Sequence, residues 1–313
     1  MTARHPAGRQ LFGYGMSSSL PTLPDAQLAP LLEAYKCARA AKLRQTALFF
    51  VALTLAVIVS AKVAEIDLFK LGANIGSFFN YFSRLFVFDS GDLQGRSVLL
   101  DIGEWYWGFR KWLRLLGDTL LIAYVGTFIG ALGAFLICFS GARNLSPNPW
   151  VRGVAKRALE FFRTVPEIVF ALIFVIAFGL GPIPGVLALS LHTFGALGKQ
   201  FLEVVENIDM RPVEGATACG ASWVDSIRFA VVPQVLSNFV SYTLLRFEIN
   251  VRGASVMGFV GAGGIGQDLI EAIRKFYYTD VSAILLMIIA TVMIVDIATA
   301  HVRHRLIGLE EAR

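Results

Sequence analysis

The sequence predicts an all-α integral membrane protein with six transmembrane helices. Of its 313 residues, 56% are hydrophobic and 16% are charged, whereas a soluble chain of this size carries about 25% charged residues. The apolar residues come in long runs, which fits a bilayer better than one large core. Basic residues cluster beside these runs, so the net charge of +5 indicates membrane orientation. It does not indicate nucleic-acid binding, because no basic helix or stacking module stands out.

Each predicted span rests on an uncharged or nearly uncharged stretch. Lys62 can lengthen the short first span by snorkelling, and Asp118 or Thr119 suits the N-cap of the second. The uncharged stretch from Ile168 to Gly198 is too long for one helix, and GPIPG at 181–185 is a turn signal. This stretch therefore predicts two spans, the first of them kinked at Pro166. The six predicted spans are residues 45–61, 119–142, 158–180, 184–202, 229–245 and 281–302.

The segments outside the spans complete the predicted organisation. Residues 1–45 form a cytoplasmic tail with an amphipathic helix, and residues 46–114 hold the first span and an external segment. In that segment Glu104–Trp112 contains three tryptophans among charges, which predicts interfacial helices, with an ordinary surface loop as the alternative. A core at 115–305 and a tail at 306–313 follow, and the bias of basic residues places both termini in the cytoplasm. Within the core, Gly126, Gly130 and Gly133 predict a bare helix face for close packing.

The polar segment from Pro212 to Pro233 separates two very apolar regions. Pro212 suits the first turn of a helix, and Glu214 then lies near the positive end of the helix dipole. Gly220 is a natural helix stop, and Ser222 to Asp225 reads as a capping box that opens a second helix. The segment therefore predicts a short cytoplasmic helix, a tight turn, and a helix that leads into the membrane.

This segment resembles the EAA motif of ABC importer permeases. The motif has Glu-Ala-Ala, three residues, Gly, nine residues, and then Ile-x-Leu-Pro. Here Glu214, Gly220 and Pro233 match at the same spacing, and so does Ala216; the departures are Gly215, Ala230 and Val232. The flanking segments RTVPEIVFALIF, GLGPIPGVLALSLHTFGALGKQF and VMGFVGAGGIGQDL look like phosphonate-type (PhnE-like) permeases, so the resemblance covers about residues 115–303.

The resemblance implies a type I ABC importer (MetI-like) permease in a bacterial inner membrane. It implies a homodimeric pore and two cytoplasmic ATPase subunits, whose grooves hold the coupling helix at 210–222 with Glu214, Gly215, Ala216 and Gly220. It also implies a periplasmic or lipid-anchored binding protein that delivers a phosphonate or a related oxyanion. ATP and Mg²⁺ then belong to the partner ATPase, and the chain binds no cofactor of its own.

Two glycine motifs bear on whether the chain could bind nucleotide itself. Gly198-Lys199 is followed by Gln200 and lacks the earlier glycine of a P-loop. Residues 261–266 match GxGxxG, but they follow a membrane span rather than the strand of a βαβ unit. We expect Gly261, Gly263, Gly264 and Gly266 to form a tight external turn near the binding protein or the pore mouth. A plain loop is the alternative.

Several charged or titratable residues lie in or near the predicted spans, where such residues usually face a pore or a partner helix. Arg252, His192 and Arg246 could attract an anion. Glu248 and Arg252 are four residues apart in the order that favours an ion pair, and His192 also suits a packing role. Asp296 could pair with His301 or with an arginine.

Three functions compete. An ABC importer permease for phosphonate-like oxyanions explains the spans and the EAA spacing together. A stand-alone secondary transporter or channel for a small anion explains the spans and the charges but not that spacing. A membrane enzyme has no support, because the sequence shows no metal-ligand spacing, no Gly-x-Ser-x-Gly and no paired intramembrane carboxylates. The sequence does not distinguish phosphonate from phosphite or phosphate.

Overall fold

A computed structural model of the chain describes residues 25–88 and 94–311, and every regular element in these ranges is a helix. The chain divides into two compact units, one ending at Ile75 and the other beginning at Gly76. Helix α1 (Asp25–Val63) belongs to the first unit, and α2 (Leu68–Arg84) crosses the boundary. From Leu32 to Val63, α1 is long and apolar enough to span a membrane.

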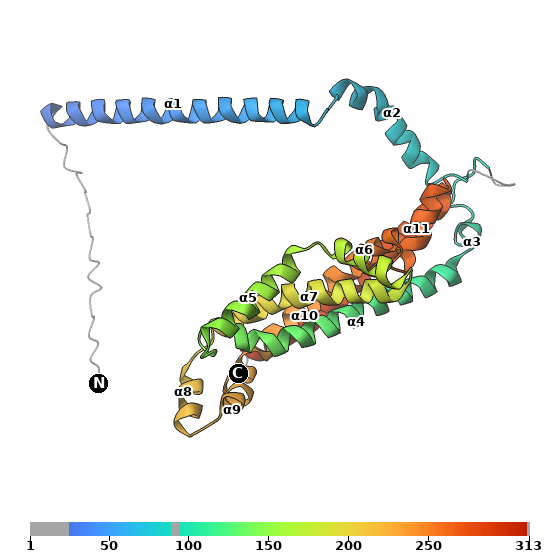
Figure 1. The fold of residues 1–313 in the computed structure, drawn as a ribbon. Coiled ribbons are helices and arrows are strands. Elements are labelled where there is room, and N and C mark those ends of the chain that lie inside the picture. Colours follow the sequence, from blue (N-terminus) through green and yellow to red (C-terminus); the bar gives the residue numbers. More distant parts are fainter. Residues whose placement is uncertain (1–24, 89–93, 312–313) are drawn as a thin grey trace, which may run out of the picture. The chain divides into compact units, whose positions relative to one another are not determined.

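The second unit is a bundle built on α4 (Phe109–Gly141), α7 (Pro182–Glu206), α10 (Val232–Met257) and α12 (Tyr278–Glu311), as Figure 1 shows. The glycine face predicted on α4 packs against α7. A Cβ atom on Gly130 would lie 2.7 Å from the main-chain oxygen of Ser190, and one on Gly126 would lie 2.8 Å from Cβ of Leu189. The prediction of a close helix contact is therefore confirmed, because only glycine leaves room for these two backbones.

The span predicted at 158–180 is two helices. Helices α5 (Pro149–Thr164) and α6 (Glu167–Phe178) meet at an angle of 85°, which is a break and not the expected kink. The cause is local. Pro166 disfavours the helical conformation at the residue before it, and Val165 is extended, with φ −74° and ψ 123°.

The N-cap predicted for the helix of the second span, Asp118 or Thr119, is also wrong. Helix α4 begins at Phe109, so Thr119 lies inside it and is not its N-cap. Thr119 instead serves another helix, because its Oγ1 accepts a hydrogen bond of 2.9 Å from the backbone N–H of Ile265, the first residue of α11 (Ile265–Arg274). Helix α4 thus already includes the polar residues that precede its apolar run. Its N-terminal part packs on the rest of the unit.

The tryptophan-rich segment lies where α3 (Ile102–Trp105) leads into α4. Trp105 is 5% exposed and Trp112 is 2% exposed, in a cluster with residues of α11 and α12. The indole N–H of Trp105 is shared between the main-chain oxygen of Thr279 and Oγ of Ser282, each at 3.1 Å. The segment is thus mostly helical, as the first of the two readings expects, and is not an ordinary surface loop. Two of its three tryptophans are core residues, however, and not the exposed aromatic side chains of an interfacial helix.

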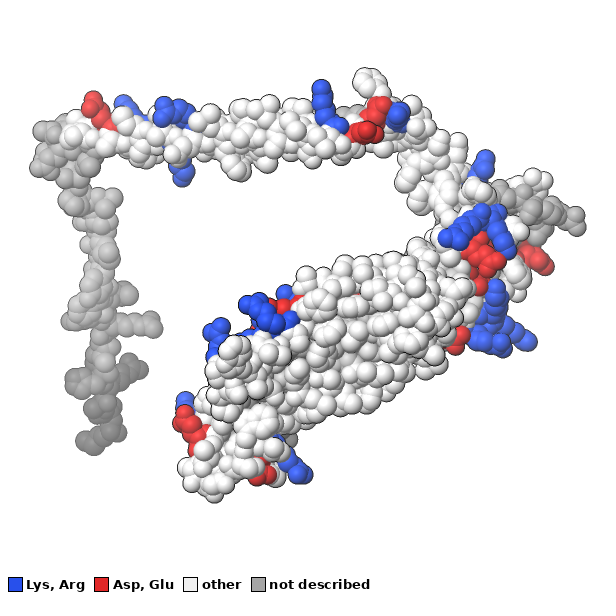
Figure 2. Space-filling model, in the orientation of Figure 1, with Lys and Arg blue, Asp and Glu red and all other residues white. Residues whose placement is uncertain are grey.

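Among the described residues, three helices are long and apolar enough to cross a membrane, and the bent pair α5–α6 makes up to four. The three are Leu32–Val63, Phe109–Gly141 and Tyr278–Arg305. The spans predicted at 184–202 and 229–245 correspond to α7 and α10, which are helical but less apolar. On the face of the second unit seen in Figure 2, charged side chains gather at the two ends and the flank between them is uncharged.

Candidate functional site

The segment around Glu214 forms the predicted short helix and tight turn. Helix α8 runs from Arg211 to Ala218, with Pro212 in its first turn and Glu214 as the acidic residue there. It ends in a Schellman motif, in which the N–H of Ala221 donates to O of Ala216 at 3.1 Å and the N–H of Gly220 donates to O of Thr217 at 2.9 Å. Gly220 has φ +83°, a conformation that glycine adopts without strain.

The second helix opens as the capping box predicts. Oγ of Ser222 accepts from the N–H of Asp225 at 3.3 Å and begins α9 (Trp223–Ser226). The chain continues through a wide π-helical turn (Ile227–Val231) into α10. Pro233 explains this turn, because proline lacks an N–H and its ring clashes with the carbonyl four residues earlier in a regular α-helix. Helices α8 and α9 form a hairpin that projects from one end of the bundle (Figure 1).

The hairpin is anchored to the bundle by its inner face. Val213 is 7% exposed and packs in the cluster that contains Phe201 and Val231. The indole N–H of Trp223 donates to O of Leu145 at 3.0 Å, which ties α9 to the segment after α4. Glu214 and Gly215 lie on the exposed side, and a Cβ atom added to Gly215 would meet nothing within 4 Å. The outer face of α8 is therefore free to contact another protein.

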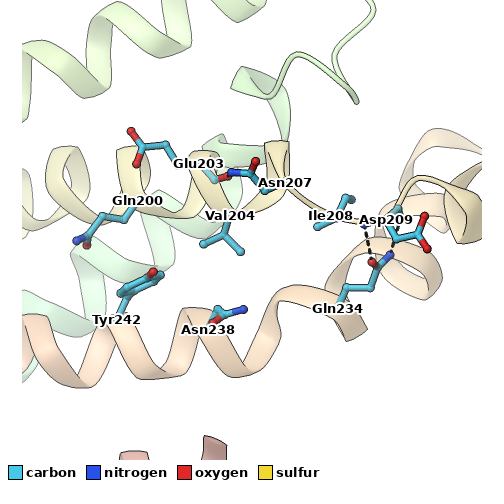
Figure 3. A pocket seen from close by; sticks show the side chains of 9 residues that line it. All are labelled: Gln200, Glu203, Val204, Asn207, Ile208, Asp209, Gln234, Asn238 and Tyr242. Atoms are coloured by element: carbon cyan, nitrogen blue, oxygen red, sulfur yellow. Dashed lines mark hydrogen bonds between the residues drawn. The ribbon is translucent and has the colours of Figure 1, made fainter. Parts of the chain in front are cut away.

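A polar hollow of about 580 Å³ lies behind the hairpin, between the end of α7 and the start of α10 (Figure 3). Gln234 from α10 spans its edge. The Gln234 amide accepts from the N–H of Asp209 and donates to O of Asp209, both at 3.2 Å. This paired contact links the first turn of α10 to the residues that precede α8. The residues that line the hollow are Gln200, Glu203, Val204, Asn207, Ile208, Asp209, Gln234, Asn238 and Tyr242.

Two of the candidate pathway residues form an ion pair. Nη2 of Arg252 lies 2.6 Å from Oε1 of Glu248, one turn earlier on α10. The same Nη2 lies 3.2 Å from Oδ2 of Asp296 on α12, so the arginine that Asp296 was expected to find is Arg252. Two carboxylates thus neutralise one guanidinium, and the group joins α10 to α12.

The other two candidates, Arg246 and His192, meet around a residue that the sequence analysis missed. Oε2 of Glu167 lies 3.7 Å from Nη2 of Arg246 and 3.6 Å from Nε2 of His192. The ring Nδ1 of His192 lies 3.0 Å from O of Val165, at the break between α5 and α6. Of the two roles that the sequence suggests for His192, attraction of an anion and packing, this contact supports the packing role. An acidic residue directly after Pro166, in an otherwise uncharged stretch, was the available signal for Glu167.

A buried polar residue on α10 also escaped the sequence analysis. Asn250 is 1% exposed, and its amide nitrogen donates to Oγ1 of Thr127 on α4 and to Oγ1 of Thr193 on α7, both at 2.8 Å. Side-chain hydrogen bonds of this kind hold helices together in apolar surroundings. Asn250 therefore fixes the three central helices beside Arg246.

The glycine-rich segment at 261–266 forms the expected tight turn. Gly261, Gly263 and Gly264 have φ of +81°, +83° and +79°. The backbone also approaches its neighbours closely, since a Cβ atom on Gly264 would lie 2.5 Å from Oγ1 of Thr119 and one on Gly266 would lie 2.0 Å from O of Ser255. The turn is filled by the protein's own chain, which accounts for its glycines without a nucleotide.

Helix α11, which follows that turn, carries ion pairs at the end of the bundle away from the hairpin (Figure 1). Nζ of Lys111 on α4 lies 2.5 Å from Oδ2 of Asp268. Nζ of Lys275 donates to Oε1 of Glu271 at 2.6 Å. This hydrogen bond holds the pKa of Glu271 below its ordinary value and raises the pKa of Lys275. The Lys111–Asp268 pair fastens α11 to α4, whereas the Lys275–Glu271 pair lies at the C-terminal end of α11 itself.

Comparison with known proteins identifies the family. The family model described as binding-protein-dependent transport system inner membrane component matches residues 126–308. The phosphite transport system permease protein PtxC of Stutzerimonas stutzeri is 46% identical over 189 residues, 60% of this chain and 69% of that protein. The phosphate-import permease protein PhnE of Mycolicibacterium smegmatis is 39% identical over 188 residues, 59% of this chain and 35% of that protein.

Solved structures share the fold. A chain of the MetNI methionine ABC transporter in inward-facing conformations superposes with a TM-score of 0.54 at 20% identity, covering 62% of this chain and 95% of that one. A second crystal form of the same transporter gives a TM-score of 0.56 at 19% identity. The fold is therefore that of a type I ABC importer permease. The chain belongs to the binding-protein-dependent transport system inner membrane components, as a multi-pass, non-catalytic permease of an ABC transporter.

Proposed function

We propose that this chain forms the translocation pathway of an ABC importer for phosphorus oxyanions, namely phosphonate, phosphite or phosphate. The observation that carries the proposal is the 46% and 39% identity to permeases named for phosphite and phosphate transport. Residues 126–308, which match the family, contain α8, the candidate pathway residues and the glycine turn.

The proposed assembly is a homodimer of this permease with two copies of a cytoplasmic ATPase, which bind ATP and Mg²⁺. A periplasmic or lipid-anchored binding protein delivers the substrate. Each permease crosses the membrane six times, by α1, α4, the α5–α6 pair, α7, α10 and α12, with both termini in the cytoplasm. Helices α7 and α10 have 25 and 26 residues, and a rise of about 1.5 Å per residue makes each long enough for the bilayer core of about 30 Å.

The proposed coupling site is the outer face of the α8–α9 hairpin. Glu214, Gly215 and Ala216 contact a groove of the ATPase, Gly220 shapes the turn, and Pro233 directs the motion into α10. Support comes from the exposure of Glu214 and Gly215 and from the contacts of Trp223 and Gln234, which tie the hairpin to the bundle. Movement of α8 would thereby tilt the spans as rigid bodies and alternate access to the pathway.

The proposed pathway passes Arg246 and His192 in the interior of the bundle, while Glu248 and Arg252 brace it through their ion pair with Asp296. We place the glycine turn, with Gly261, Gly263, Gly264 and Gly266, at the pore mouth near the binding protein. In support, it lies beside α11, at the end of the bundle away from the α8–α9 hairpin (Figure 1).

Uptake by proteoliposomes that hold this permease and its ATPase tests the function. With binding protein outside and ATP inside, we expect uptake of at least one of methylphosphonate, phosphite and phosphate, and none of it without ATP. Growth on each compound as the sole phosphorus source, with and without the gene, identifies the substrate in cells. Uptake that survives removal of the ATPase subunits contradicts the proposal and favours a stand-alone transporter.

A further inference from the structure

We propose that Arg246 binds the oxyanion inside the bundle through one edge of its guanidinium group, and that Glu167 is an internal carboxylate that competes for this edge. The inference rests on the proposed function and deepens it, because it assigns a substrate contact and a release device to two named side chains.

The first observation is that Arg246 has buried donors without acceptors. Its side chain is 11% exposed, and its Nε and Nη2 have no hydrogen-bond partner among the described residues. A buried donor left unpaired destabilises the folded protein, so two such donors on one side chain point to an acceptor that comes from elsewhere. Nε and Nη2 form one edge of the planar group, the fork that takes two oxygens of a carboxylate or phosphate together.

The second observation is the position of Glu167. Its Oε2 lies 3.7 Å from Nη2 of Arg246 and 3.6 Å from Nε2 of His192, close enough for charge attraction but too far for hydrogen bonds. The Glu167 side chain is 30% exposed and therefore has room to move. Its Oε1 lies over Gly253, where a Cβ atom would come within 2.7 Å. Glu167 thus balances the charge of Arg246 but accepts no hydrogen bond from its Nε or Nη2.

The third observation is where the group lies in the fold. Arg246 and His192 lie near the middle of α10 and α7, and Glu167 is the first residue of α6, directly after the α5–α6 break. The N-terminus of a helix carries partial positive charge, so the break adds to the attraction for an anion. Broken helices at the middle of the membrane form binding sites in other transporters for the same reason.

These observations indicate that the oxyanion and Glu167 bind Arg246 in turn. An oxyanion that enters takes the two free donors and displaces the Glu167 carboxylate by charge repulsion. When the bundle changes conformation, Glu167 returns to Arg246 and weakens the hold on the oxyanion. Arg252 has no such role, because Glu248 and Asp296 already occupy it.

The test compares three variants of the full transporter with its ATPase in lipid nanodiscs. Binding of phosphite, phosphate and methylphosphonate is measured by equilibrium dialysis, with sulfate as a further anion. Arg246→Lys keeps the charge but loses the fork, and we expect about ten- to hundredfold weaker binding of the transported anion, since hydrogen bonds to charged groups contribute about 1.5–3 kcal/mol. Glu167→Gln removes the competitor, so we expect binding several-fold tighter and slower release. Arg157→Lys, at an exposed arginine of α5 that pairs with Glu160, is the matched control and leaves the affinity within about twofold.

The outcomes separate the inference from the proposed function. If the wild-type complex takes up none of the three phosphorus anions, the proposed function fails. If it transports one of them and both Arg246→Lys and Glu167→Gln bind it with wild-type affinity, the inference is overturned. Misfolding is monitored by assembly with the ATPase and by basal ATP hydrolysis. Tighter binding by Glu167→Gln cannot result from misfolding, so this variant decides the question alone if Arg246→Lys does not assemble.

Discussion

Gly220 offers the sharpest test of how the α8–α9 hairpin is built. Its φ is +83°, and a Cβ atom added there would meet nothing within 4 Å. Replacement by alanine therefore introduces backbone strain without a steric clash. The left-handed conformation costs a residue with a Cβ atom about 1–2 kcal/mol. This cost falls on the Schellman motif that ends α8, where the N–H groups of Gly220 and Ala221 are bound.

Hydrogen exchange of the α8–α9 segment in the purified permease, without its ATPase, measures the effect. A loss of about 1–2 kcal/mol corresponds to a factor of about 5–30 in the local opening equilibrium. We therefore expect the amides of residues 220 and 221 to exchange faster by that factor in Gly220→Ala. Transport per ATP hydrolysed should fall as well, because the hairpin then holds its shape for less of the time. Asparagine tolerates the left-handed conformation, so Gly220→Asn should recover part of the protection.

Gly215→Ala is the matched control. Gly215 also has open space around its Cα, but it lies inside α8 with helical backbone angles. There the same methyl group favours the helix by about 0.5–1 kcal/mol, so exchange should slow or stay unchanged. The reasoning is refuted if Gly220→Ala leaves the exchange of these amides unaltered, or if both substitutions accelerate it equally.

Three further predictions concern the bundle. Gly130→Ala places a methyl group 2.7 Å from the backbone of α7 and should destabilise the protein by about 1–3 kcal/mol. Gly117→Ala on the same helix meets open space and should not destabilise it. Equal thermal midpoints of unfolding for the two variants would contradict this prediction. Asn250→Ala removes two interhelical hydrogen bonds and should lower stability by at least about 1 kcal/mol, which denaturation in detergent detects; an unchanged midpoint would show that the bonds contribute nothing. Gln234→Ala breaks the link to the residues before α8 and should lower transport per ATP by about two- to tenfold. Gln200→Ala, in the same hollow, should leave that ratio unchanged, and an equal loss in both variants would remove the special role of Gln234.

Local features were predictable from the sequence because they depend on neighbours in the chain. The α8–α9 hairpin followed from Pro212, Gly220 and the Ser222 capping box, each of which restricts the backbone or satisfies a helix end by itself. The glycine face of α4 followed from a spacing of four residues. The break at Pro166 was underestimated as a kink, since the angle between two helices depends on what each one packs against.

Contacts between distant residues were not predictable in this way. The pairing of Glu167 with Arg246, and of Arg252 with Asp296, joins helices that are far apart in the chain. Thr119 was expected to cap its own helix and instead caps α11. The tryptophans near residue 105 suited a membrane interface by composition, but packing against α12 buries two of them.

The sequence alone determined the class of this protein, a helical membrane permease, and the position and shape of the α8–α9 hairpin. Apolar runs, charge bias and turn residues act over short distances, and their physical consequences do not depend on the rest of the fold. Only the tertiary structure decided, for the described part of the chain, which charged side chains of the bundle are already paired and that Arg246 keeps free donors. A charge in an apolar bundle is stabilised by whatever side chain reaches it, and which side chain does so depends on the packing of all the helices together.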